Sequence, residues 1–195
     1  MTDPEILFGI YCPPHPQPLL SPDASDGYAK LREAFDTCRK RIEESEADLI
    51  LVYSTTWPSI IGHQIQAHPE PEWVHVDDDF HYLGSMPYKF KMDTEFAEKF
   101  KESAESRGLQ SRTVSYDGFP IDTGSIVALK LLNPDNRIPA CIVSSNMYAN
   151  RAETIVLGKS ARDAIGSQGK KAVVVVVSVS YTHLRAHETR GNLVC

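Results

Sequence analysis

The chain has no basic run and no long apolar run, and these absences exclude several classes of protein. Its net charge is -6 at pH 7, which argues against a surface for nucleic acid or anionic membranes. No apolar stretch approaches the roughly 20 residues that a membrane-spanning helix needs. The acidic amino terminus, Met1–Glu5, lacks the basic and apolar parts of a secretion signal. We therefore expect a cytoplasmic protein with no nucleic-acid or membrane partner.

Cysteine is scarce, with four residues and no C-x-x-C pair. This usage suits a reduced cytoplasm. Cys38 and Cys141 are most simply small core residues. We interpret Cys12 in the same way, because thiolate ligands suit other iron or zinc chemistry than the one considered below.

Three familiar functional motifs are missing. No G-x-G-x-x-G follows the first strand-like run, and no G-x-x-x-x-G-K-[ST] occurs, so nucleotide cofactors are disfavoured. No G-x-S-x-G turn is available for a serine hydrolase. Histidines and acidic residues remain as the candidates for chemistry.

What the sequence does contain is an alternation of apolar runs and helical periodicity. The spacing predicts strands at 6–11, 48–54, 138–144 and 171–177, with shorter ones at 72–76 and 110–115, and helices over 25–46, 93–107, 123–132 and 153–167. The segment 77–86 has the pattern of an exposed loop. This order predicts one three-layer α/β domain with a mostly parallel central sheet flanked by helices.

Two histidines follow two of these strand-like runs. His15 lies among prolines after the first, and Gly62 and His63 come after the second. Loops that leave the carboxyl ends of parallel strands share one edge of the sheet, so neighbouring strands would bring the two imidazoles together. They would then supply two thirds of a metal site that lacks only a carboxylate. Two alternatives remain open. His15 could be a loop histidine that is hydrogen-bonded to a backbone carbonyl, and Gly62 could be an ordinary turn residue.

The end of the chain changes character abruptly. The valines at 173–177 are typical of a central buried strand, whereas the sequence from Val179 onward resembles a translated sequencing adapter. We therefore divide the chain into a domain at 1–177, incomplete at its carboxyl end, and a non-native tail at 178–195. His183 and His187 have the spacing of zinc ligands on a helix, but in such a tail this spacing carries no meaning.

Several short motifs, in their order and spacing, resemble the class III extradiol ring-cleavage dioxygenases, the relatives of the protocatechuate 4,5-dioxygenase catalytic subunit. The likeness covers nearly all of residues 5 to 177 and is greatest to the subunits of 2-aminophenol 1,6-dioxygenases. The motifs are Pro14-His15-Pro16, Val52-Tyr53-Ser54-Thr55-Thr56-Trp57, Gly62-His63, Val74-His75-Val76-Asp77 and the run from Tyr116 to Gly124.

This resemblance implies an Fe(II) enzyme that inserts O₂ into a catechol or 2-aminophenol type of ring. It implies His15 and His63 as iron ligands, a glutamate near the carboxyl end as the third, and an acid/base histidine beyond Val177. Asp122 would line the substrate pocket, although capping the following helix explains it equally well. The run at 117–124 looks more like the non-catalytic partner subunit, so the alternative is a structural subunit. Either way, the resemblance implies a homo- or hetero-oligomer with a homologous subunit.

The other notable polar residues have simpler interpretations. His68, His75 and His81 lack matched spacing and are expected on the surface or in loops. The acidic run 77–79 lacks the pattern of a calcium-binding loop and is expected to be a solvated turn. Trp57 is expected to be a packing residue.

Overall fold

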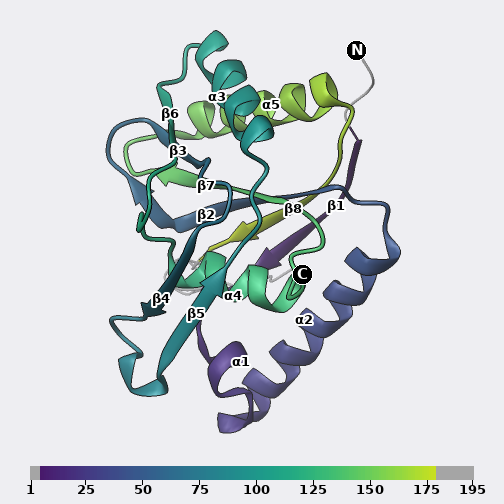
Figure 1. The fold of residues 1–195 in the computed structure, drawn as a ribbon, viewed down its shortest axis with the longest axis vertical. Coiled ribbons are helices and arrows are strands. Elements are labelled where there is room, and N and C mark those ends of the chain that lie inside the picture. Colours follow the sequence, from purple (N-terminus) through teal and green to yellow (C-terminus); the bar gives the residue numbers. More distant parts are fainter. Residues whose placement is uncertain (1–4, 179–195) are drawn as a thin grey trace, which may run out of the picture.

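The structure, a computed structural model, describes residues 5–178 and is built around one six-stranded sheet (Figure 1). The strands of this sheet are β1 (Glu5–Cys12), β2 (Leu49–Ser59), β3 (His63–Gln66), β6 (Ser111–Val114), β7 (Ala140–Asn146) and β8 (Lys171–Val177). Their order across the sheet is β1-β8-β2-β7-β3-β6. All neighbouring pairs are parallel except β3 and β7, which are antiparallel. The predicted mostly parallel α/β sheet is confirmed.

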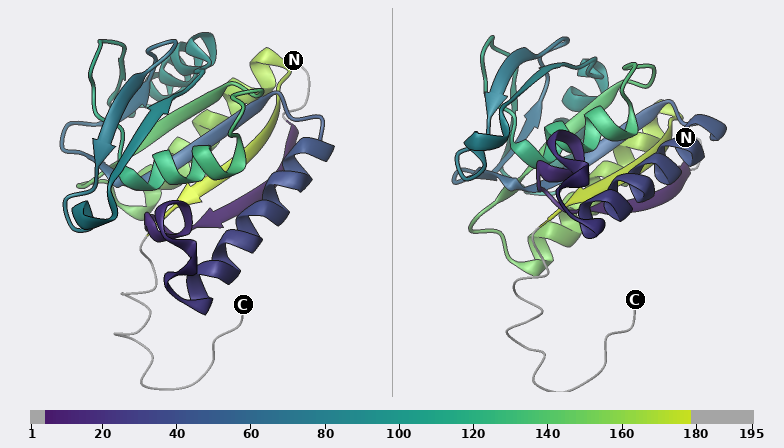
Figure 2. Two further views of the ribbon diagram at one scale, coloured as in Figure 1. Left: turned by 60° about the horizontal axis from the view of Figure 1, so that its bottom comes forward. Right: turned by 90° about the horizontal axis from the view of Figure 1, so that it is seen from below.

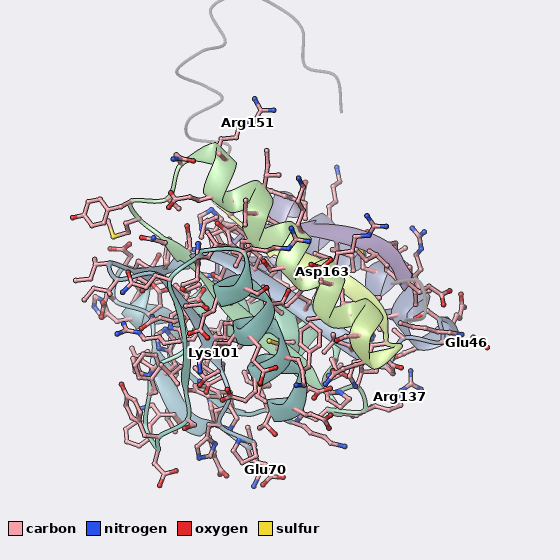
Figure 3. All side chains as sticks on the ribbon, turned by 90° about the horizontal axis from the view of Figure 1, so that it is seen from above. Glu46, Glu70, Lys101, Arg137, Arg151 and Asp163 are labelled. Atoms are coloured by element: carbon pink, nitrogen blue, oxygen red, sulfur yellow. The ribbon has the colours of Figure 1, made fainter. Side chains whose placement is uncertain are left out.

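Helices cover both faces of the sheet (Figure 2). The main ones are α2 (Asp26–Glu44), α3 (Thr94–Ser106), α4 (Thr123–Leu132) and α5 (Arg151–Gln168), and shorter ones are α1 (Gln17–Leu20), η1 (Pro22–Ala24) and η2 (His81–Leu83). One face packs against α2 and α4 and is called the α2/α4 face. The other packs against α3 and α5, which lie side by side in Figure 3, and is called the α3/α5 face. No helix within residues 5–178 is both long and apolar enough to cross a bilayer.

The alternation of side chains along the strands builds a separate core on each face. In β2, Ile50 and Val52 belong to the core under α2 and α4, whereas Leu49 and Leu51 belong to the core under α3 and α5. Strand β8 lies inside the sheet between β1 and β2, and its burial explains its valine run.

A small antiparallel sheet stands beside the main one. It consists of β4 (Glu72–Val76) and β5 (Ser85–Lys89), and its Met86 and Tyr88 are buried against the core under α2 and α4. Strand β5 begins inside the segment expected to be a loop, so that prediction is partly wrong. Only alternate residues of β5 are buried and one of the others is Pro87, which hides the strand from a search for apolar runs.

The order of the strands corrects one premise of the sequence analysis. The runs that precede the two candidate histidines are β1 and β2, and these strands are not neighbours, because β8 lies between them. In addition, His63 does not lie in a loop: it is the first residue of β3. Four-residue strands such as β3 are too short to give a recognisable periodicity.

Candidate functional site

A cavity of about 390 Å³ opens at the edge of the sheet where β1 and β2 end. We call it the edge pocket. Its residues come from the loop after β1, the last part of β2, the end of β4 with the acidic turn that follows, and the first turn of α4. They are Pro14, His15, Thr56, His75, Asp77, Asp78, Asp79, Phe80, Asp122 and Thr123. This is the edge at which ligands bind in open α/β sheets.

A close contact at Gly124 brings these elements together. A Cβ atom at this position would lie 2.4 Å from Val177 Cγ1 and 2.8 Å from Pro14 Cβ. Only glycine therefore allows the first turn of α4 to approach the loop after β1 so closely. The result is that His15 and Asp122 line the same cavity.

Asp122 both caps α4 and lines the edge pocket, so its two interpretations are compatible. Its Oδ2 atom accepts hydrogen bonds from Ser125 N at 3.0 Å, Ser54 Oγ at 2.9 Å and Thr56 Oγ1 at 2.7 Å. Its Oδ1 atom is buried and has no hydrogen-bond partner among residues 5–178. One carboxylate oxygen is thus saturated, while the other keeps its capacity to accept a hydrogen bond from a ligand.

His75 is a pocket residue that sequence reasoning missed. Its Nε2 atom lies 2.8 Å from Thr123 Oγ1, and the Thr123 hydroxyl donates to Asp77 Oδ2. Since that hydroxyl has one proton and gives it to Asp77, its oxygen accepts from a protonated Nε2. Among the five residues of β4 only His75 is partly buried, so no alternation of apolar residues along the strand indicates its position.

His15 is half-buried in the edge pocket and its ring meets Phe80 edge-on, with centroids 6.2 Å apart. His63 has a different environment. It is 2% exposed, and its Nδ1 atom lies 3.4 Å from the carbonyl oxygen of Ser144. Two residues further along β3, Ile65 belongs to the core under α3 and α5, so His63 faces that side as well.

The two candidate iron ligands are therefore not brought together. Strand β3 lies four positions from β1 in the sheet, about 19 Å at the usual strand spacing. The edge pocket, in contrast, lies at the start of α4, on the opposite face from α3 and α5. Within the described residues, no group of three or more His, Cys, Asp or Glu side chains is arranged to hold a metal ion.

The residue that β2 does contribute to the edge pocket is Thr56. Its hydroxyl is engaged with Asp122, and a neutral hydroxyl is a poor substitute for imidazole or carboxylate as an Fe(II) ligand. The residues of this part of the chain thus do not fit an Fe(II) centre held by His15 and His63. We derive no chemical step through iron from them.

Of the residues expected in the core, Cys12, Cys141 and Trp57 are buried, whereas Cys38 is only partly buried against the core under α2 and α4. Cys12 and Cys141 are buried, and burial, with a smaller contribution from Cys38, raises the pKa of the Cys12 thiol to about 12. Trp57 is 5% exposed and donates from Nε1 to the Pro120 carbonyl at 2.9 Å. Neither Cys12 nor Cys141 nor Trp57 lines the edge pocket.

The burial of His63 predicts a loss of stability in mild acid. Desolvation lowers the pKa of His63, and the Ser144 carbonyl and Glu153 oppose this shift only in part. The unfolded chain therefore binds more protons than the folded one below about pH 6.5, so the free energy of unfolding decreases as the pH falls through this range. We expect the urea midpoint of the wild type to drop between about pH 7.5 and pH 5.5, and His63→Gln to reduce the drop.

The control for this measurement is His81→Gln, which changes an exposed histidine. It should leave the drop unchanged. An equal reduction in both variants would contradict the assignment of the pH dependence to His63.

Comparison with protein families gives a match over residues 9–192 to the family described as "Catalytic LigB subunit of aromatic ring-opening dioxygenase". The match extends into the segment 178–195, of which the structure describes only Ser178. His183 and His187 lie outside the described residues.

Two curated relatives from Pseudomonas sp. are named as alpha and beta subunits of 2-aminophenol 1,6-dioxygenase. The chain is 30% identical to the 2-aminophenol 1,6-dioxygenase alpha subunit over 173 residues, which cover 88% of this chain and 64% of that protein. It is 30% identical to the beta subunit over 203 residues, which cover 96% of this chain and 66% of that protein. The chain thus spans slightly less than two thirds of the length of either relative.

A solved structure shares the fold. It is described as an uncharacterized protein, JW3007, from Escherichia coli K12, with a TM-score of 0.55 and 18% sequence identity. The superposition covers 81% of this chain and 57% of that one.

Proposed function

Because this chain belongs to the aromatic ring-opening dioxygenase family, we propose that it is the amino-terminal part of a companion subunit. In this proposal it assembles with a homologous subunit that holds Fe(II), and the pair acts on a catechol or 2-aminophenol type of ring and O₂. The two Pseudomonas relatives carry the names of alpha and beta subunits of one enzyme, which supports an assembly of homologous chains.

The observation that carries the proposal is the composition of the edge pocket. His15 stands at the end of β1, but the side chain that β2 directs into the same cavity is that of Thr56. His63 is buried beside Ser144 on the other face of the sheet. An iron site of this kind needs two imidazoles and a carboxylate on one side of the metal. The edge pocket contains His15 and His75, but His75 Nε2 is engaged with Thr123 Oγ1, and no group of three or more His, Cys, Asp or Glu side chains among the described residues is arranged to hold a metal ion.

The alternative is that the chain is the amino-terminal part of an iron-holding catalytic subunit. It would use His15 and His63 as ligands, together with a glutamate and an acid/base histidine from beyond Val177. The two strand-end histidines and the family match favour it. It requires His63 to leave its buried position and to cross to the other face of the sheet.

The test is anaerobic Fe(II) binding by the full-length protein, purified alone and together with its homologous subunit. We expect far less than one iron per chain in the protein alone, and no change in His15→Ala or His63→Ala. We expect turnover of 2-aminophenol or protocatechuate by the pair. The isolated 195-residue chain should not cleave either ring.

A different result would restore the catalytic alternative. That result would be binding of about one iron per isolated chain, with this binding lost in His15→Ala and in His63→Ala. Both variants should lose it because each ligand of a three-ligand site contributes strongly to the affinity for iron. The natural sequence downstream of Val177 gives a cheaper indication. A Ser-His pair after the strand and a later glutamate would favour the iron-holding subunit.

A further inference from the structure

A second cavity, of about 260 Å³, lies between β4–β5 and the loop before α4. We call it the hairpin pocket. Aromatic side chains line it: Trp73, Tyr88, Tyr116 and Phe119. The rings of Tyr116 and Phe119 meet edge-on with centroids 5.0 Å apart, and Phe119 is itself supported by Trp57 at 5.8 Å. Trp73 and Tyr116 are both 61% exposed, so large aromatic surfaces face the solvent.

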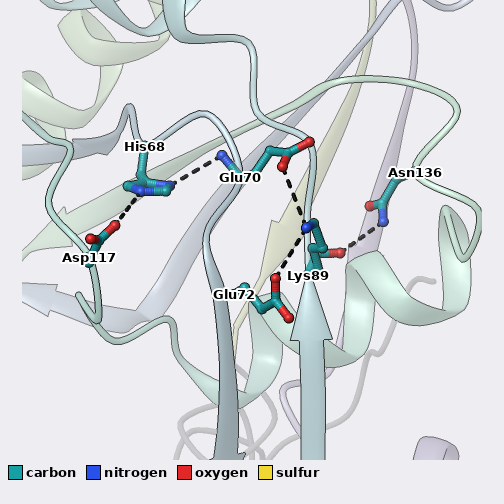
Figure 4. A network of polar contacts seen from close by, with 6 residues as sticks. All are labelled: His68, Glu70, Glu72, Lys89, Asp117 and Asn136. Carbon is teal, nitrogen blue, oxygen red and sulfur yellow. Dashed lines mark hydrogen bonds and ion pairs between the residues drawn. The ribbon is translucent and has the colours of Figure 1, made fainter.

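The same cavity has an excess of negative charge (Figure 4). Glu70 and Glu72 share one cation, since Lys89 Nζ lies 3.5 Å and 3.2 Å from their carboxylates. Asp117 accepts from His68 Nε2 at 2.8 Å. Three carboxylates thus surround the cavity with a single ammonium group among them.

His68 does not neutralise this excess. Its Nδ1 atom accepts a hydrogen bond from the Glu70 backbone N–H at 3.2 Å, so its Nε2 atom carries the proton that is given to Asp117. A neutral imidazole satisfies both contacts. It holds the Asp117 carboxylate at the mouth of the cavity, where that side chain is 98% exposed and available to a ligand.

We propose that the hairpin pocket binds a guanidinium group, presented as an arginine side chain by another protein chain. A guanidinium ion stacks on aromatic faces and donates to carboxylates in pairs, so its chemistry matches both kinds of wall. Within residues 5–178 no ligand set for a metal ion accompanies these carboxylates. The residues of the hairpin pocket would bind this group whether or not the function proposed above is correct.

The surroundings favour a side chain of a protein over a free small molecule. The hairpin pocket shares Glu72, Trp73 and Tyr88 with a shallower cavity over the outer side of β4 and β5. That cavity is lined by Val74, which is 55% exposed, and by Pro87. Aromatic side chains and arginine are enriched at the centres of protein interfaces, so an aromatic pocket bordered by an apolar surface suits an arginine from a partner chain.

The first experiment is a titration of the full-length protein with N-acetyl-arginine amide, followed by tryptophan fluorescence. Trp73 is the useful reporter, because the chain has two tryptophans and Trp57 is buried. We expect a saturable change with a Kd in the millimolar range, as for a single charged contact without a surrounding interface. The control N-acetyl-citrulline amide has the same shape without the charge, and it should produce no saturable change.

Variants then locate the site. The double substitution Glu72→Gln with Asp117→Asn should weaken binding about tenfold, since it removes two charge-assisted contacts. Glu98→Gln changes a half-exposed carboxylate on α3 and should have no effect. Equal binding of the arginine and citrulline probes would overturn the proposal. The proposal would also be overturned if the double variant bound the arginine probe with full affinity, or if the wild type showed no saturable binding.

A last measurement distinguishes an arginine side chain within a protein from free arginine as the source of the guanidinium group. Free arginine carries an additional ammonium and carboxylate, which a side chain within a protein lacks. Equal or weaker binding of free arginine relative to the acetylated amide supports the side-chain assignment. Markedly tighter binding of free arginine would overturn it in favour of a small-molecule ligand.

Discussion

Replacing Thr56 by histidine is expected to raise the affinity of the edge pocket for a divalent metal. Thr56 lines the cavity together with His15 and Asp122, and Asp122 Oδ1 is buried without a hydrogen-bond partner among the described residues. The substitution Thr56→His would place a new imidazole beside His15 and the Asp122 carboxylate, whereas the other histidine of the pocket, His75, is engaged with Thr123. Two imidazoles and a carboxylate on one side are the usual ligands of non-haem Fe(II). We expect the affinity for Co(II) or Fe(II) to rise at least about tenfold.

The measurement is anaerobic titration of the full-length protein with Co(II), followed by its visible absorption. Thr55→His is the matched control, because Thr55 donates to the Val177 carbonyl at 3.1 Å and does not line the edge pocket. Adding His15→Ala to Thr56→His should remove the gain. A similar gain in Thr55→His, or a gain that survives the loss of His15, would show that Thr56 does not occupy a ligand position.

The position of Thr56 beside His15 depends on the order of strands across the sheet, which cannot be read from the sequence. Local patterns predict the elements well: an apolar face repeating every three or four residues predicts α2, and a valine run predicts β8. The order of strands across the sheet is set by long-range pairing instead. Because β8, the last strand along the described chain, inserts between the first two, the residues that follow β1 and β2 are not equivalent in space.

The sequence likewise predicts only part of the candidate site. His15 and Asp122 do line one pocket, since both lie at junctions of strands and helices that local signals reveal. His63 was singled out by its place in the sequence, but β2 continues to Ser59 and the chain then returns as β3, which carries His63 to the other face. His75 was missed because only its approach to Thr123 gives it a role.

The second large effect concerns Gly124, and we expect Gly124→Ala to destabilise the fold by about 1–3 kcal/mol. The new methyl group would lie 2.4 Å from Val177 Cγ1 and within 3.0 Å of two atoms of Pro14. Val177 belongs to a central strand and a proline ring cannot change its backbone torsion, so neither neighbour can move freely. Relief requires α4 to shift away from the loop that carries His15, which would widen the edge pocket.

Gly158→Ala provides the matched control, because Gly158 lies inside α5 and a Cβ there would meet nothing within 4 Å. That substitution should stabilise the protein by about 0.5–1 kcal/mol, since alanine loses less backbone entropy than glycine in a helix. The two urea midpoints should therefore move in opposite directions at the same pH. If Gly124→Ala left the midpoint unchanged, the first turn of α4 would not be held against Pro14 and Val177. The juxtaposition of His15, Thr56 and Asp122 that underlies the metal-binding prediction would then lose its physical basis.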